Sequence, residues 1–381
     1  MGWNDIIGQE RIKRIIQRAI IQNRVAHAYC FSGIEGIGKD GLAIEFAKTV
    51  NCENPIINDD SIDACRKCPS CRSFETLTHQ NIQLIFSLPA EKSGADSKKE
   101  TVMTRLSEED ANLVQEEIKQ KSKDYYHRIE IPNATQIRIA SIREVKRSLT
   151  LSAPTAGRRF VIIIRAEEMT KESANAFLKT LEEPHTGITI ILTTSKKEFI
   201  LPTILSRCQL IECEPLSEDL IANSLIEKKN ISPEDARLIA QFAQGSYSKA
   251  LDFLNEDMKS NRELIVEALR RSLRTINYRL DLLEIVEKIV KMNDKNKYET
   301  LLVLLLLWLR DTYSMQKSKS NDYVINQDNL EVLTRFVNKF QDKEMNLAID
   351  LIEKAILQIR RNVQPQLIFI NLFVKMRELF L

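Results

Sequence analysis

A glycine-rich stretch near the amino terminus has the residue types that bind phosphate. The stretch FSGIEGIGKD, residues 31–40, presents its glycines and lysine in the order G-x-x-x-x-G-K. In this pattern backbone N–H groups surround phosphate oxygens, and the lysine reaches the β and γ phosphates. A strand pattern precedes the stretch and a helix pattern follows it, and a helix amino terminus attracts anions. The sequence therefore predicts a phosphate loop formed by Gly33, Gly36, Gly38 and Lys39.

Two parts of the sequence depart from what nucleotide hydrolysis requires. Asp40 stands where such loops have Ser or Thr, and its carboxylate would repel a triphosphate. The next buried strand ends in FVIIIRAEEMT, with Ile164 and Arg165 where an acidic pair should bind Mg²⁺ and position water. We therefore expect weakened nucleotide binding and no ATP hydrolysis. The alternative is an active ATPase in which Asp40 binds Mg²⁺ and Glu167 is the base.

Four cysteines have the spacing of a metal site. Cys52, Cys65, Cys68 and Cys71 form the pattern C-x12-C-x2-C-x2-C. Four thiolates close a tetrahedral Zn²⁺ site with no open position, which indicates a structural ion. An iron–sulfur cluster is the rival, but its usual fourth Cys-Pro spacing is missing. The other cysteines, Cys30, Cys208 and Cys213, are expected to be small buried side chains.

Alternating strand and helix patterns must position these residues. Apolar runs predict strands at 27–33, 157–166 and 187–195, and three- and four-residue spacing predicts helices at 42–52, 139–149 and 171–183. Such alternation is typical of an α/β domain with a mainly parallel sheet. The charged segment 90–128 interrupts it, and we expect a solvated surface insertion with a helix capped at Ser107. The alternative for this segment is a contact with DNA or a partner.

The second half of the chain is expected to be helical. Ser217 and Ser232 are predicted helix N-caps, and the run LLVLLLLWL, residues 301–309, predicts a buried helix because about 20 residues are needed to cross a bilayer. The chain has 55 Lys and Arg against 53 Asp and Glu, so its net charge favours neither a nucleic-acid nor a membrane partner. Without a signal-peptide pattern at its start, the chain is expected to be cytoplasmic.

Five stretches together resemble the delta-prime subunits of the bacterial DNA polymerase III clamp loader, a family within the AAA+ superfamily. They are IIGQE at 6–10, GIEGIGKD at 33–40, AEEMTKESANAFLKTLEEP at 166–184, ILTTSKKEFILPTILSRCQ at 191–209 and AQGSYSKAL at 243–251. The resemblance spans most of the chain but is weaker over 90–134 and over the last hundred residues. It implies a RecA-like AAA+ α/β domain at 1–213 with a zinc module inserted at about 52–71, a helical lid at 214–257 and an all-α collar at 258–381.

The resemblance also implies roles for individual residues. Ser206-Arg207-Cys208 matches the arginine-finger motif, in which the arginine enters the ATP site of the neighbouring subunit. The alternative is that Arg207 caps a helix or pairs with a local carboxylate. Ser248 stands where motor subunits have an arginine that senses the γ-phosphate. The polar residues 193–195 match the family's sensor at a strand end, and the alternative is that they only form hydrogen bonds there.

A non-hydrolysing subunit of the DNA polymerase III holoenzyme follows from these implications. Its expected partners are the gamma/tau ATPase subunits and the delta subunit, with the beta sliding clamp and primer-template DNA in the assembled complex and no membrane. The competing interpretations are an active clamp-loader ATPase of the gamma/tau type and a zinc-stabilised nucleic-acid-binding module. The near-neutral net charge disfavours the last of these.

Overall fold

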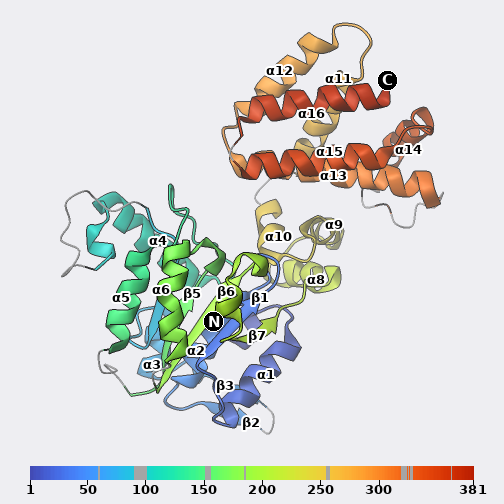
Figure 1. The fold of residues 1–381 in the computed structure, drawn as a ribbon. Helices are drawn as coiled ribbons and strands as arrows, with labels where there is room; N and C mark the ends of the chain where they lie inside the picture. Colours follow the sequence, from blue (N-terminus) through green and yellow to red (C-terminus); the bar gives the residue numbers. More distant parts are fainter. Residues whose placement is uncertain are drawn as a thin grey trace. The chain divides into compact units, whose positions relative to one another are not determined.

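A five-stranded parallel sheet forms the centre of the first part of the chain (Figure 1). The strand order is β4-β5-β6-β1-β7, and each neighbouring pair is parallel. The strands are β1 (Ala28–Ser32), β4 (Ile82–Ile85), β5 (Arg159–Ile163), β6 (Ile188–Thr194) and β7 (Gln209–Glu212). A short antiparallel pair, β2 (Ile56–Asn58) and β3 (Ser61–Asp63), lies outside this sheet.

The chain divides into two compact units in this computed structural model. The first contains Met1–Ile231 and Ala243–Lys249, and the second contains Ser232–Phe242 and Ala250–Leu381. The structure describes all residues except 59–60, 90–100, 151–155, 184–185, 255–257, 319–323, 325, 327–328 and 362. The expected lid at 214–257 is divided between the two units, and its expected end at 257 lies outside the described residues. The three-part domain division therefore stays a prediction.

Helices cover both faces of the sheet because alternate strand residues point to opposite sides. On one face, Val161 and Ile163 of β5 belong to a core that includes Val145 of α5 (Ile139–Thr150) and Phe177 of α6 (Lys171–Glu182). On the other face, Phe46 of α2 (Lys39–Val50) makes edge contacts with Tyr29 and Phe160, each with ring centroids 5.4 Å apart. The other helices of at least seven residues in the first unit are α1 (Glu10–Ile21), α3 (Pro69–Glu75), α4 (Glu108–Lys123) and α8 (Glu218–Lys229).

The expected strands and helices are present, within a few residues of their predicted ends. Two strands of the sheet were not predicted, β4 and β7, each of four residues. Only Ile85 of β4 and Ile211 of β7 are buried, so neither strand carries the long apolar run that marks a strand buried on both faces. The edge positions of β4 and β7 explain this exposure.

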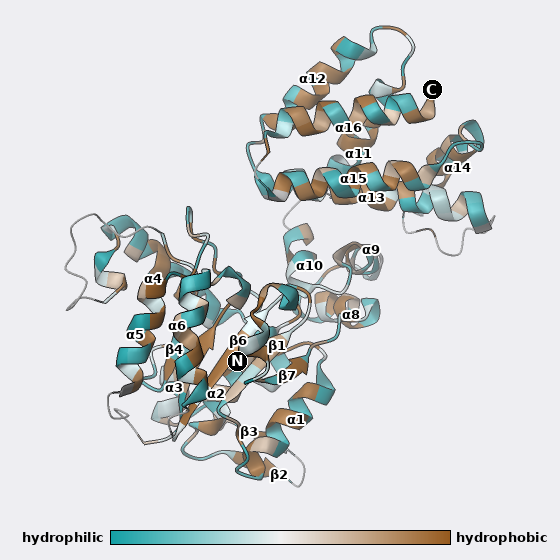
Figure 2. Cartoon of the chain, viewed as in Figure 1, coloured by the Kyte–Doolittle hydropathy of each residue, from teal (hydrophilic) through white to brown (hydrophobic). Residues whose placement is uncertain are grey.

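The second unit is helical. It contains α9 (Pro233–Ala243), most of α10 (Tyr247–Leu254), α11 (Met258–Ser272), α12 (Tyr278–Val290), α13 (Lys295–Ser318), α14 (Leu330–Lys339), α15 (Met345–Arg360) and α16 (Pro365–Phe380). The predicted apolar helix is α13, and Leu301, Leu305 and Trp308 are buried in it. Hydrophobic and hydrophilic residues both occur along the length of these helices (Figure 2). The two predicted N-caps are present. Ser217 of the first unit accepts from the Leu220 N–H at the start of α8, and Ser232 of the second accepts from the Asp235 N–H at the start of α9.

No helix within the described ranges has the length and apolar character needed to cross a membrane.

Candidate functional site

The predicted phosphate loop lies between β1 and α2. Gly36 and Gly38 have φ values of 78° and 95°, and glycine adopts this left-handed region without the steric cost of a side chain. The Lys39 Nζ donates hydrogen bonds to the carbonyl oxygens of Gly33 and Ile34, at 2.8 and 2.7 Å. Burial lowers the pKa of Lys39, against the opposing effect of nearby acidic groups. The lysine therefore binds the loop's own backbone in this structure.

Asp40 is held by two partners at the start of α2. Its carboxylate lies 3.1 Å from the Lys121 Nζ and accepts a 2.7 Å hydrogen bond from the Thr193 hydroxyl at the end of β6. Burial acts to raise the pKa of Asp40, but Lys121, the Thr193 hydrogen bond and Lys39 outweigh it and lower the pKa below its usual value. Asp40 is therefore ionised at neutral pH and already neutralised by a side chain.

The end of β5 lacks the acidic pair that would hold Mg²⁺ and orient water. Ile164 is buried, and Arg165 donates to the Ile129 carbonyl at 2.8 Å and lies 3.1 Å from Glu168. Glu167, the base of the alternative interpretation, accepts hydrogen bonds from the Ser195 backbone and hydroxyl at 3.1 and 2.7 Å. Its second carboxylate oxygen, Oε2, is buried without a hydrogen-bond partner.

The expectation of a solvated insertion at 90–128 was wrong for its carboxyl-terminal part. The predicted cap is present, since Ser107 accepts from the Asp110 N–H at 3.0 Å. However, Lys121, Tyr125 and Tyr126 are 2%, 3% and 6% exposed, because the chain after α4 packs on the phosphate loop. Residues 90–100 lie outside the described range. The cavity that remains above the loop is about 50 Å³, whereas ligand pockets are typically about 300–1,000 Å³.

Arg207 follows the short helix α7 (Pro202–Leu205) and is not among the residues that line the cavity over the phosphate loop. Its guanidinium donates to the Glu182 carboxylate at 2.9 Å and to the Thr203 carbonyl at 2.8 Å. The two paired side chains are 34% and 46% exposed, and an ion pair this exposed contributes only about 0–1 kcal/mol. Arg207 is therefore partly accessible and weakly held.

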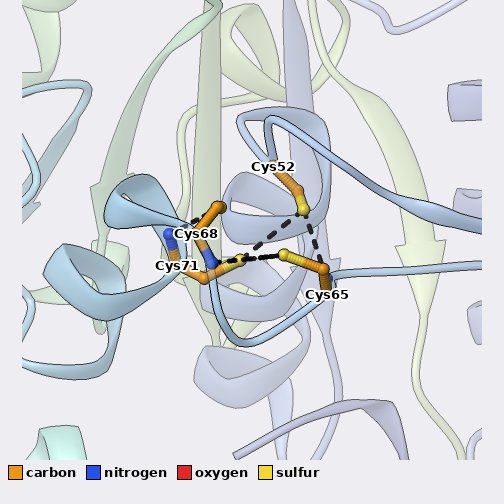
Figure 3. A group of neighbouring side chains, drawn as sticks. All are labelled: Cys52, Cys65, Cys68 and Cys71. Atoms are coloured by element: carbon orange, nitrogen blue, oxygen red, sulfur yellow. Dashed lines mark hydrogen bonds between the residues drawn. The ribbon is translucent and has the colours of Figure 1, made fainter.

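Four cysteine side chains meet beside α3, as the spacing predicts (Figure 3). Their sulfur atoms all lie within 4.8 Å of one another, with Cys71 Sγ 3.6 Å from Cys52 and 3.9 Å from Cys65. The sulfurs of a tetrahedral zinc site are roughly 3.8 Å apart, given Zn–S bonds of about 2.3 Å. The four cysteines could therefore hold a metal ion without a large rearrangement.

Local structure places these thiols and lowers the pKa of one of them, Cys65. Cys68 is the N-cap of α3, and the N–H groups of Cys68 and Cys71 donate to the sulfurs of Cys65 and Cys68, both at 3.4 Å. Hydrogen bonds from the Lys67 and Cys68 backbone lower the pKa of Cys65 to about 6. This thiol is then ionised at neutral pH, the form that binds metal. The buried Cys71 thiol has a raised pKa, which a bound cation would reverse.

The remaining cysteines are placed largely as predicted. Cys30 and Cys213 are buried, and Cys208 is partly buried. Burial raises the pKa of Cys30 to about 11 and those of Cys208 and Cys213 to about 12. Thiols with these pKa values are not nucleophiles at neutral pH.

The parallel five-stranded sheet, with a phosphate loop between β1 and α2, fits a RecA-like AAA+ fold. The family described as DNA polymerase III, delta subunit, matches residues 8–217, which is more than half of the chain. The chain belongs to this family. The resemblance to clamp-loader subunits of the delta-prime kind is therefore confirmed.

Known relatives include several kinds of clamp-loader subunit. DNA polymerase III subunit delta' of Bacillus subtilis is 23% identical over 370 residues, which covers 97% of this chain and 96% of that protein. Subunit tau of the same organism is 25% identical over 268 residues, 69% of this chain and 39% of that protein. A solved gamma subunit-related protein from Thermotoga maritima matches 98% of this chain and 99% of that chain with 17% identity and a TM-score of 0.41.

One residue of the phosphate-loop region was missed from the sequence. Lys121 lies 81 positions from its partner Asp40, in a segment where lysines are frequent. The available signal was Asp40 itself, since a carboxylate in a phosphate-loop sequence favours a cation nearby. The spacing of residues in the sequence could not show which lysine or arginine is this cation.

Proposed function

We propose that this chain is a non-hydrolysing clamp-loader subunit of the delta-prime kind, which helps to assemble the sliding clamp onto primer-template DNA. It supplies Arg207 in trans to the ATP site of a neighbouring gamma/tau-type subunit. The helical residues from about 258 form the collar that joins it to the other subunits. The cysteine cluster binds a structural zinc ion.

The observation that carries the proposal is the content of the phosphate-loop site. Asp40 is neutralised by Lys121 and Thr193, and Ile164 and Arg165 stand where phosphoryl transfer needs an Mg²⁺ ligand and a group that orients water. A site with these residues keeps Lys39 but lacks the Mg²⁺ ligand and the group that orients water. We infer that ATP hydrolysis in the assembled complex is carried out by other subunits.

Arg207 is suited to act outside its own subunit. A guanidinium stabilises charge on a transferring γ-phosphoryl group, and such fingers are worth about 10³–10⁵ in rate. The partly exposed ion pair with Glu182 contributes little free energy, so Arg207 can leave it to bind a phosphate at small cost. We assign Arg207 no step of ATP chemistry within its own subunit, since it is not among the residues that line the cavity over the phosphate loop.

The proposal is tested by assays of the purified chain and of the assembled complex. The chain alone should not convert ATP to ADP, whereas its addition to the motor and delta subunits should raise clamp- and DNA-stimulated turnover. Steady hydrolysis by the chain alone, with contaminating enzymes excluded, would reject the proposal.

An active ATPase of the gamma/tau type is the competing function. Sequence identity to gamma and tau subunits is in the same range as identity to delta', and the unpartnered Oε2 of Glu167 offers a basic oxygen near the loop. In that case Glu167→Gln would abolish turnover by the isolated chain. Our proposal expects no turnover to abolish.

A further inference from the structure

Three positions that depart from the ATPase pattern contact the same segment of the chain. Asp40 binds the Lys121 ammonium, Arg165 donates to the Ile129 carbonyl at 2.8 Å, and the Ser248 hydroxyl donates to the Tyr126 carbonyl at 2.8 Å. These positions are the ones where an ATPase would have a hydroxyl, an acid and a γ-phosphate sensor. We propose that residues 121–129 are an internal ligand of the phosphate loop, and that these three departures are its binding contacts.

The Lys121 ammonium is the centre of this internal ligand. It lies at 3.1 Å from Asp40 and donates to the carbonyls of Tyr125 and His127, both at 2.8 Å. With 2% of its surface exposed, it is a buried cation that satisfies all three of its N–H donors. It supplies positive charge beside the phosphate loop, where an ATPase would place Mg²⁺.

The two tyrosines that follow α4 close the space over the loop. The Tyr125 hydroxyl donates a hydrogen bond to the buried Glu45 carboxylate of α2. The Tyr126 hydroxyl accepts one from the Ile7 N–H at 2.7 Å. A Cβ atom on Gly41 would lie 2.7 Å from Tyr125, and one on Gly38 would lie 3.2 Å from the Tyr126 hydroxyl. The segment therefore touches the backbone of the loop and of α2 directly. On this proposal, a nucleotide would have to displace the segment to enter.

The inference extends the proposed function and is distinguishable from it. The proposed function requires that the chain does not hydrolyse ATP and that Arg207 acts in trans. The inference requires in addition that nucleotide and residues 121–129 compete for one place. If the two compete, a change that raises the fraction of molecules with the segment open must raise the apparent nucleotide affinity by the same factor.

Hydrogen exchange on the full-length chain tests the contact with Asp40. The amides of Tyr126 and His127 donate to Asp124 in the closed segment. Lys121→Met leaves the partly buried Asp40 carboxylate without its cation, so exchange of these amides should rise about 100-fold. When Lys121→Met is combined with Asp40→Asn, both charges are gone. Exchange of the same amides should then be at least tenfold slower than in Lys121→Met alone. Lys119→Ala is the matched control, because Lys119 lies on the exposed face of the same helix with 61% of its side chain exposed.

A fluorescent ATP analogue with Mg²⁺ tests the competition itself. The wild-type chain should show no saturable binding at submillimolar concentrations. Asp40→Thr with Lys121→Ala, which restores the usual hydroxyl type and removes the ammonium, should bind at least tenfold more tightly.

Three results would overturn the inference: wild-type exchange rates in Lys121→Met, micromolar binding by the wild-type chain, or no gain in the double variant. Binding without hydrolysis by the wild-type chain would reject the internal ligand and leave the proposed function intact. A complex whose turnover ignores Arg207 would reject the proposed function and leave the internal ligand intact.

Discussion

Arg207 and Glu182 form a pair whose two members have different expected effects. Arg207→Ala should slow the ATP site that receives the finger by about 10³-fold or more, and the complex should lose the share of turnover that this site contributes. Glu182→Ala breaks the same ion pair but leaves the guanidinium, so turnover should be retained. The measurement is DNA-stimulated ATPase of the reconstituted complex. Equal loss in both variants would show that only the local ion pair matters.

Asp40 gives the first unit a predictable response to acid. Its pKa is lowered in the folded chain, so its stabilising contribution is present above the unfolded pKa of about 3.9 and is lost as pH falls through the lower folded value. The difference in unfolding temperature between the wild-type chain and Asp40→Asn should therefore be largest near neutral pH. It should shrink below about pH 4. A difference that persists unchanged at the acid end would contradict this assignment of charge.

At the scale of elements, the cysteine cluster lies in a region with few buried apolar side chains. Ile56 and Ile57 of β2 are exposed, and Ile62 and Ala64 are the buried aliphatic side chains in the described part of the loop between α2 and α3. The cluster is attached to the sheet through Asn51, which receives a hydrogen bond from Ser70 at 2.7 Å and donates to the Arg158 carbonyl at 2.8 Å. Metal binding should therefore order the segment that contains the four cysteines, residues 52–71, and hold it against Arg158 at the start of β5.

Replacing Cys68 by Ser should remove about one equivalent of bound zinc and loosen this segment, because four thiolates are needed to close the tetrahedron. Elemental analysis and hydrogen exchange over residues 52–79 are the measurements. Cys208→Ser is the control, since Cys208 lies outside the cluster, and its metal content should equal that of the wild-type chain. Metal should also leave on acidification, because protons compete for the thiolates. A brown, iron-containing protein would contradict the zinc assignment.

At the scale of the whole molecule, the two units have separate cores. In the second unit Trp308 of α13 is 2% exposed and packs edge-on against Phe336, with centroids 4.8 Å apart. Trp308→Ala should cost about 3–5 kcal/mol of the stability of this unit. Hydrogen exchange should accelerate over 258–318 while the strands β1 and β5 keep wild-type rates. Acceleration in both places would show that the two units unfold as one.

The fold was predictable where local patterns are strong. The Val-Ile-Ile run of β5, the serine caps at 107, 217 and 232, and the apolar face of α13 all carry periodic or capping signals. β4 and β7 could not be predicted because edge strands bury few side chains. The insertion could not be placed because charged residues near one another in sequence normally indicate solvent exposure, and burial depends on a partner supplied by the fold.

The sequence by itself determined the residue chemistry of this protein: a glycine-rich loop with a lysine, an aspartate in place of a hydroxyl, no acidic pair at Ile164 and Arg165, and four cysteines at metal-binding spacing. Each of these is a local pattern, so no folding is needed to recognise it. Only the tertiary structure decided that Lys121 neutralises Asp40 across 81 residues and that residues 121–129 fill the space over the loop. Contacts at such separations depend on how helices and strands pack, and that packing leaves no periodic signal in the chain.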